Sequence, residues 1–330
     1  MREKIQNVFI TGGAGYVGAV LVPELLEEGY KVTVLDLMIY GDQVLPTHEN
    51  LKVIKGDIRD RGLLADCIET QDAVIHLACI SNDPSFELDP NLGKSINLDS
   101  FEPLVQISKE KQVKRFIYAS SSSVYGVKEE ANVTEDMTLE PLTDYSKFKA
   151  ECERILTKYH DEGFTAVTIR PATVCGYSPR QRLDVVVNIL SNLAYHKRSI
   201  SIFGGSQMRP NIHIKDMALA YKLLLTAPRE KVANEVFNAG YENHTVEQLG
   251  QMVIDVMGPD VEMRKTPTDD NRSYHVSSEK IRDELGFEPR YSIRDAVIDL
   301  KEAFTQGLLE DPLTNEMYSN IKRMQSLKLN

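Results

Sequence analysis

The chain has 330 residues, of which 42% are hydrophobic, and a formal net charge of −11 at pH 7. This apolar content is enough for a packed core and too high for a disordered chain. The acidic balance argues against nucleic acid or an anionic membrane as a partner, because both need clustered Lys and Arg. The length fits one large domain or two ordinary ones.

Cysteine and histidine residues show no pattern of a disulfide framework or a metal centre. The four cysteines are scattered without a CxxC pair, and the seven histidines are dispersed. We therefore expect reduced thiols and no metal site. The first residues lack the apolar segment of a signal peptide, and no run approaches the length of a membrane span. These features predict a cytoplasmic protein without a membrane partner.

A glycine-rich stretch, TGGAGYVG at residues 11–18, joins an apolar run to a segment with helical spacing of apolar residues at 16–28. Backbone N–H groups at such a turn can bind a phosphate. A side chain at Gly12 or Gly15 would block a pyrophosphate, and one at Gly18 would push the helix off the sheet. A second strand at 31–35 leads to Asp36, roughly 20 residues on, where dinucleotide sites place an acid for the adenosine ribose.

The first half of the chain continues to alternate strands and helices. We expect strands at 51–55, 73–78, 115–119 and 165–170. We expect helices ending near Cys67, at 92–111 and at 145–161. The alternation predicts an α/β fold, a Rossmann-type doubly wound parallel sheet with right-handed crossovers. Ligands of such sheets bind beyond the carboxyl ends of the strands.

The alternation is lost after Pro171. Residues 1–174 are predicted to form a dinucleotide-binding domain, to whose sheet a strand near 233–240 returns. Residues 175–330 are predicted to form mostly a smaller, mixed α/β substrate-binding domain. Its expected elements are a helix at 246–257, a strand near 261–265, helices at 277–285 and 293–306, and a polar, loosely held tail after Gly307.

A tyrosine and a lysine on the helix at 145–161 suggest proton transfer. Tyr145 and Lys149 are four residues apart and so share a helix face. A cationic lysine beside a phenol lowers the phenol pKa and makes the tyrosine a usable base near neutral pH. A serine hydroxyl from the strand end at 120–123 can bind the same substrate oxygen. This set suits removal of an alcohol proton while hydride leaves the carbon for a nicotinamide.

With these motifs the chain resembles the extended short-chain dehydrogenase/reductases, of the NAD-dependent nucleotide-sugar epimerase/dehydratase type. The resemblance begins with the glycine-rich stretch and continues through most of the chain. The further marks are GD at 56–57, HLA at 76–78, Asn97, residues 120–126, Tyr145 with Lys149, Arg170-Pro171 and IHIKD at 212–216.

The resemblance implies an NAD cofactor, a nucleotide-sugar substrate, a homodimer and residue roles by position. Tyr145 would be the catalytic base and acid, Lys149 would hold the nicotinamide ribose, and Ser121 would be the hydroxyl partner. The other implied cofactor contacts are Gly12, Gly15, Tyr16, Val17, Asp36, Asp57, Ile58, Leu77, Ala78, Ala119 and Pro171. The implied substrate contacts are Ser122, Ser123, Asn188, Arg209 and Arg272. No Arg or Lys closely follows Asp36, which favours NAD over NADP.

One departure from the family pattern bears on the reaction. Ser122 and Ser123 stand where similar sugar 4,6-dehydratases place Asp-Glu, and serine cannot protonate a leaving hydroxyl or abstract a proton from C5 at neutral pH. We therefore expect an epimerase that oxidises the sugar at C4 to a transient keto intermediate and returns the hydride. A nucleotide-sugar 4-dehydrogenase or 4-ketoreductase stays open, with a GDP-sugar suggested by residues 178–184. A 4,6-dehydratase and a dinucleotide sensor without turnover are further alternatives.

Overall fold

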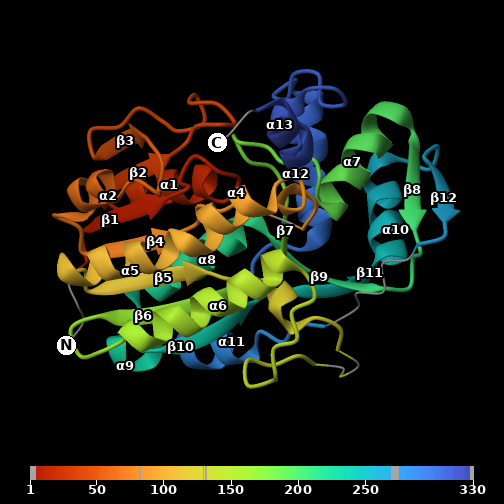
Figure 1. Ribbon diagram of the computed structural model, residues 1–330. Coiled ribbons are helices and arrows are strands. Elements are labelled where there is room, and N and C mark those ends of the chain that lie inside the picture. The colour runs from red at the N-terminus through yellow and green to blue at the C-terminus, as the bar shows by residue number, and fades with distance from the viewer. Residues whose placement is uncertain (1–4, 82, 129, 131, 269–274, 328–330) are drawn as a thin grey trace.

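A computed structural model describes residues 5–81, 83–128, 130, 132–268 and 275–327 (Figure 1). Within these residues, seven parallel strands form the main sheet in the order β10-β6-β5-β4-β1-β2-β3. The strands are β1 (Asn7–Thr11), β2 (Lys31–Asp36), β3 (Leu51–Lys55), β4 (Ala73–His76), β5 (Arg115–Ala119), β6 (Thr165–Pro171) and β10 (Glu235–Ala239). The predicted doubly wound parallel sheet is confirmed, and β10 is the strand that was expected to return to it.

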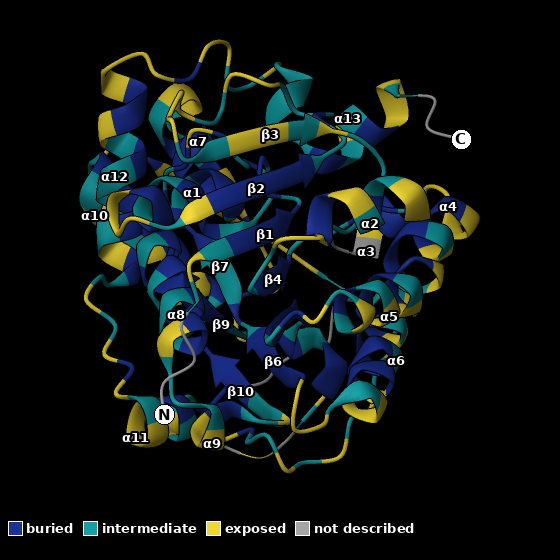
Figure 2. Ribbon diagram, turned by 90° about the vertical axis from the view of Figure 1, so that its left-hand side faces the viewer, coloured by how far each residue is buried: buried dark blue, intermediate teal, exposed yellow. Residues whose placement is uncertain are grey.

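Helices cover both faces of the main sheet (Figure 2). One layer contains α1 (Gly18–Glu27), α8 (Ile214–Thr226) and α11 (Glu279–Leu285), and the other contains α2 (Arg61–Ile68), α5 (Phe101–Glu110) and α6 (Asp144–Tyr159). Val8 and Ile10 belong to the first core and Phe9 to the second, because successive strand side chains point to opposite faces. All three are fully buried, which explains the continuous apolar run in the sequence.

The helix expected at 92–111 is interrupted. α4 (Pro90–Lys94) continues into a π-helical turn, η1 (Ser95–Asp99), before α5 begins. In this turn Asn97 accepts the Ile80 N–H at 2.8 Å and donates to the Ile80 carbonyl at 2.9 Å. The π turn thus fixes the loop after β4, and such turns often mark functional sites.

Most of the remaining strands and three long helices form a smaller lobe, while several short helices stay with the main sheet (Figure 1). The lobe holds a sheet of β7 (Thr173–Cys175), β9 (Met208–His213) and β11 (Glu242–Thr245), and a pair of strands, β8 (Ser199–Phe203) and β12 (Glu262–Thr266). Its main helices are α7 (Val186–Lys197), α10 (Val246–Met257) and α12 (Ile293–Thr305). The short helices are α3 (Asp83–Phe86), η2 (Ser122–Tyr125) and α9 (Arg229–Val232). The second half of the chain therefore contributes to the main sheet as well as to the smaller lobe, since β10 is part of that sheet and α8 and α11 cover one of its faces.

The chain beyond Gly307 differs from the loosely held tail that its polarity predicts. A 3-10 turn, η3 (Glu316–Tyr318), and the helix α13 (Asn320–Ser326) return toward the main sheet (Figure 1). Met324 is buried in the core on the α5 and α6 side. Arg323 Nε donates to the Ile39 carbonyl at 2.6 Å. The buried side chains of Leu309 and Met324, together with hydrogen bonds, hold this polar segment.

Candidate active site

A cavity of about 540 Å³ lies at the carboxyl ends of the main strands and extends to the smaller lobe. This edge is where sheets of this type bind ligands. Of the residues assigned to the cofactor, the cavity is lined by Gly12, Gly15, Tyr16, Val17, Asp36, Ile58, Leu77, Ala78, Ala119, Tyr145, Lys149 and Pro171. Ser121, Ser122, Ser123 and Arg209 also line it.

The glycine turn at 11–18 brings backbone close to the cavity. Gly12 has a φ of +73°, and a Cβ there would lie 2.6 Å from the Ala78 nitrogen. A Cβ at Gly18 would lie 2.4 Å from the Gly13 oxygen, so Gly18 is required by the turn itself rather than by the sheet. α1 has no side-chain cap and no acidic residue in its first turn. Its N-terminus is therefore suited to an anion such as a pyrophosphate.

The acid at the end of β2 is held by backbone. Asp36 accepts the Ala14 N–H at 3.0 Å and the Met38 N–H at 2.8 Å, one on each oxygen. Burial raises the pKa of this carboxyl, and the two N–H groups work against that rise. Each oxygen keeps a lone pair for a ribose hydroxyl. Asp57 is not among the residues that line this cavity, and it forms an ion pair with Arg59 at 2.7 Å.

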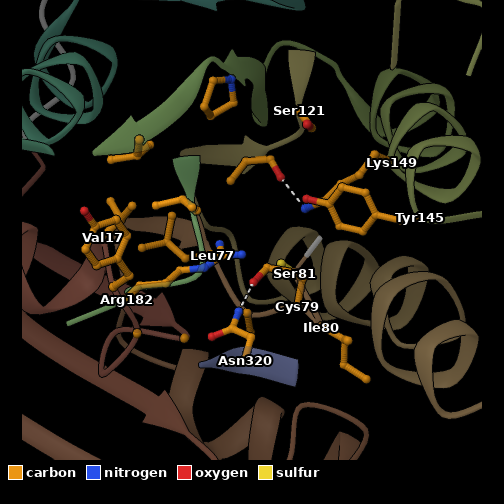
Figure 3. A pocket seen from close by; sticks show the side chains of 18 of the residues that line it. Val17, Leu77, Cys79, Ile80, Ser81, Ser121, Tyr145, Lys149, Arg182 and Asn320 are labelled. Atoms are coloured by element: carbon orange, nitrogen blue, oxygen red, sulfur yellow. Dashed lines mark hydrogen bonds between the residues drawn. The ribbon is translucent and has the colours of Figure 1, made fainter. Parts of the chain in front are cut away.

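Ser121, Tyr145 and Lys149 lie together on one side of the cavity (Figure 3). A capping box begins α6 at Asp144, which puts Tyr145 in the first turn and Lys149 one turn later. Lys149 Nζ donates to the Ala119 carbonyl at 2.6 Å and lies 5.8 Å from the centroid of the Tyr145 ring. Ser121 caps η2 and shares a hydrogen bond with Ser123 Oγ at 2.9 Å. The end of β5 and the first turns of α6 thus bring the predicted set together.

A buried network supports this side of the cavity. Arg170 donates to both oxygens of Glu153, from Nη2 at 2.7 Å and from Nε at 3.0 Å. Ser120 Oγ donates to Glu153 at 2.5 Å. Arg170 Nη1 donates to the Tyr125 hydroxyl, which donates to Asn238, both at 2.7 Å. The network joins α6 to the ends of β5, β6 and β10.

The residues predicted to contact the substrate differ in where the structure places them. Arg209 lines the cavity, and its Nη1 donates to the Met208 carbonyl at 3.0 Å. Asn188 is fully buried and braces the cavity wall: its Oδ1 accepts the Gly176 N–H and its Nδ2 donates to the Tyr16 hydroxyl. The structure therefore does not bring Asn188 to the cavity. Arg272 lies outside the described residues.

The sequence profile of the NAD-dependent epimerase/dehydratase family matches residues 8–240, more than half of the chain. The chain belongs to this family. A UDP-glucose 4-epimerase of Corynebacterium glutamicum is 26% identical over 322 residues, which cover 92% of this chain and 96% of the relative. A dTDP-glucose 4,6-dehydratase of Streptomyces niveus is 26% identical over 319 residues, with 90% and 92% covered. The structure of MoeE5 in complex with UDP-glucose and NAD matches with a TM-score of 0.81 at 26% identity, over 92% of this chain and all of that one.

Membership in the NAD-dependent epimerase/dehydratase family confirms the predicted family and cofactor class. The glycine turn, the uncapped α1 and Asp36 fit such a dinucleotide. Epimerases and dehydratases both occur among the relatives, so similarity alone leaves the reaction type open.

No helix in the described part of the chain is long and apolar enough to cross a membrane. The same residues contain no cluster of three or more His, Cys, Asp or Glu side chains that could hold a metal ion.

Several cavity residues were not assigned from the sequence. They come from the loops after β2 and β4, from the segment at 176–184 and from α13. The main ones are Tyr40, Cys79, Ser81, Arg180, Arg182, Asn320 and Met324. The segment at 178–184 suggested a GDP-sugar, but none of its residues was assigned to the site. α13 offered no signal, because its two cavity residues are isolated in a polar tail.

Proposed function

We propose that this protein is a nucleotide-sugar epimerase that oxidises the sugar at C4 to a transient keto intermediate and reduces it again from the opposite face. The observation that carries the proposal is the grouping of Ser121, Tyr145 and Lys149 at the carboxyl end of β5. When bound, NAD accepts the hydride and gives it back. The relatives that act on UDP-glucose and dTDP-glucose support a nucleotide-sugar substrate.

Each member of the set has a distinct task in this reaction. Tyr145 takes the proton of the sugar hydroxyl and later returns it. Lys149 stabilises the phenolate by its charge, and its hydrogen bond to Ala119 fixes the amine in place. Ser121 donates a hydrogen bond to the sugar oxygen as the carbonyl forms and disappears. The same groups serve both half-reactions, so no further acid or base is needed.

Dehydration would need more groups than this set offers. It requires an acid for the leaving hydroxyl and a base for the C5 proton, and Ser122 and Ser123 can provide neither. Among the described residues that line the cavity, the carboxylates are Asp36 and Asp184. Asp36 is held by two backbone N–H groups, and Asp184 is ion-paired with Arg182 at 2.6 Å. Both are committed to other contacts, which argues against dehydration.

We assign Arg209 to bind the diphosphate of the nucleotide-sugar substrate. Its side chain lines the cavity from β9, on the side of the smaller lobe. A guanidinium presents a planar fork of donors that matches phosphate oxygens. A substitution of Arg209 should therefore weaken substrate binding and leave cofactor binding unchanged.

The experiment is incubation of the purified protein with UDP-, dTDP- and GDP-sugars without added cofactor, followed by mass spectrometry and NADH absorbance. We expect an isomer of unchanged mass and no lasting NADH signal. A product that has lost two hydrogens, together with persistent NADH, would instead identify a net oxidoreductase. Loss of water would identify a dehydratase. Either result refutes the epimerase assignment.

A pair of tyrosine variants on α6 tests the catalytic assignment. Tyr145→Phe should lower turnover by about 10²–10⁴-fold, the range for loss of a general acid or base, and should still bind NADH. Tyr159→Phe is the matched control, because Tyr159 lies at the far end of the same helix, does not line the cavity, and donates from its hydroxyl to Glu102 at 3.0 Å. Equal activities in the two variants would contradict the role of Tyr145.

A further inference from the structure

Arg180 is a buried cation that the catalytic set does not use. It lines the cavity, yet only 3% of its surface is exposed. Its Nη2 donates to Asn320 Oδ1 at 2.6 Å, while Nε and Nη1 have no hydrogen-bond partner within the described parts of the chain. The guanidinium stacks on Tyr40, with Cζ 3.5 Å from the ring centroid. Leaving a buried charge with unpaired donors is costly unless a ligand completes the site.

The neighbours of Arg180 belong to the dinucleotide end of the cavity. Ser178 Oγ donates to the Tyr16 carbonyl at 2.8 Å, and the Tyr16 hydroxyl donates to the Gly176 carbonyl at 2.6 Å. The segment that carries Arg180 is therefore bound to the glycine turn. The Arg180 charge also opposes the burial that raises the pKa of Asp36. Arg180 thus stands beside two features that recognise the dinucleotide.

We propose that Arg180 binds the pyrophosphate of the dinucleotide, facing it from the side opposite the glycine turn, and that α13 completes this site. Two unpaired N–H groups of a planar guanidinium match two phosphate oxygens. The nucleotide diphosphate of the sugar substrate has the same chemistry, and the test below separates the two. The inference depends on the family's cofactor and not on the epimerase reaction.

Asn320 positions Arg180 and ties three segments together. Besides accepting from Arg180, it donates from Nδ2 to Ser81 Oγ at 2.7 Å (Figure 3). Its backbone N–H donates to Asp184 at 2.7 Å. The first residue of α13 therefore links the loop after β4 to the segment at 177–184 across the cavity. A dinucleotide bound beneath these contacts would leave slowly, because its release would disturb them.

The test measures release of NADH from loaded protein, by fluorescence after mixing with excess NAD. Arg180→Met should release NADH at least about tenfold faster than the wild type, the loss expected for a charged hydrogen-bonded contact. Arg180→Lys keeps the charge but loses the planar pair of N–H donors, so its rate of NADH release should lie between those of the wild type and Arg180→Met. Asn320→Ala should also speed release, because it frees the guanidinium. Arg209→Met is the matched control and should leave NADH release unchanged.

A second arm measures binding of UDP and GDP to the NADH-loaded protein. Arg209→Met should weaken this binding and Arg180→Met should not. If Arg180→Met weakens nucleoside diphosphate binding and leaves NADH release unchanged, Arg180 serves the substrate and the proposal is wrong. Neither arm requires turnover, so a failed epimerase assay would not affect the result.

Thermal unfolding distinguishes a binding role from a structural one. Arg180→Met removes an incompletely paired buried charge, so it should not lower the melting temperature in the absence of added NADH. It should reduce the rise in melting temperature that added NADH produces. An equal loss of melting temperature with and without NADH would show that Arg180 only supports the fold, which overturns the proposal.

Discussion

Glu153→Gln tests whether a buried ion pair fastens α6 to the main sheet beneath the catalytic candidates. Glu153 and Arg170 are 7% and 4% exposed and share two hydrogen bonds. The substitution keeps the shape of the side chain but leaves the Arg170 charge buried without its carboxylate. Breaking such a pair costs about 3–5 kcal/mol. A domain is stable by only about 5–15 kcal/mol, so the loss should be a large part of the total.

The assay is urea unfolding followed by circular dichroism, with Glu151→Gln as the control on the same helix. Glu151 pairs with Arg154 at 2.9 Å, but the two side chains are 40% and 67% exposed. An exposed pair of this kind contributes at most about 1 kcal/mol. We expect a much larger fall in the urea midpoint for Glu153→Gln. Similar falls in both variants would refute the argument that burial makes the Glu153 pair important.

Three further variants test other parts of the reasoning. Lys149→Met should lower kcat about 10²–10⁴-fold and move the pH–rate profile to higher pH, whereas Lys147→Met, an exposed neighbour, should change neither. Gly18→Ala should lower the free energy of unfolding by about 1–3 kcal/mol, measured by thermal unfolding, because the added Cβ clashes with the Gly13 backbone. Gly62→Ala, in the first turn of α2 where a Cβ meets no close contact, should leave the free energy of unfolding unchanged or raise it by up to about 1 kcal/mol. Burial lowers the pKa of His76 to about 3, so the folded state binds this proton less readily than the unfolded chain. The contribution of neutral His76 to the free energy of unfolding is therefore fully present above about pH 6.5 and is lost as the pH falls. Between pH 7 and pH 5 the free energy of unfolding should fall by about 2 kcal/mol from this residue, and His76→Gln should not show this fall.

The main sheet was predictable because most of its strands are buried on both faces, the edge strand β3 being the exception. Such strands read as continuous apolar runs, as residues 8–10 do, and each is followed by a turn or a helix signal. The glycine turn and the pair of Tyr145 and Lys149 were equally visible, because both are defined by short, fixed spacings in the sequence. Local sequence was sufficient wherever local geometry decides the structure.

Long-range contacts limited the rest of the prediction. Asn188 has the residue type of a substrate contact, but the same amide can satisfy buried backbone groups, and the structure uses it in that way. The π turn at Asn97 depends on its contact with Ile80 across a loop. Asn320 bonds to Ser81, which is 239 residues away in the chain. No periodicity or spacing encodes such contacts.

The position of α13 connects cofactor binding with the fate of the hydride. An epimerase must reduce its own keto intermediate, so NADH has to remain bound until the sugar has turned over in the cavity. A net oxidoreductase must instead release NADH or meet a second substrate. The contacts of Asn320 with Ser81, Arg180 and Asp184 close the cavity wall on the dinucleotide side. In the arrangement proposed above, a wall held in this way would slow the release of NADH while the sugar reaches Tyr145 from the side of the smaller lobe. Competition between hydride return and NADH release would then decide between the two reactions, and we propose that the wall shifts this competition toward return.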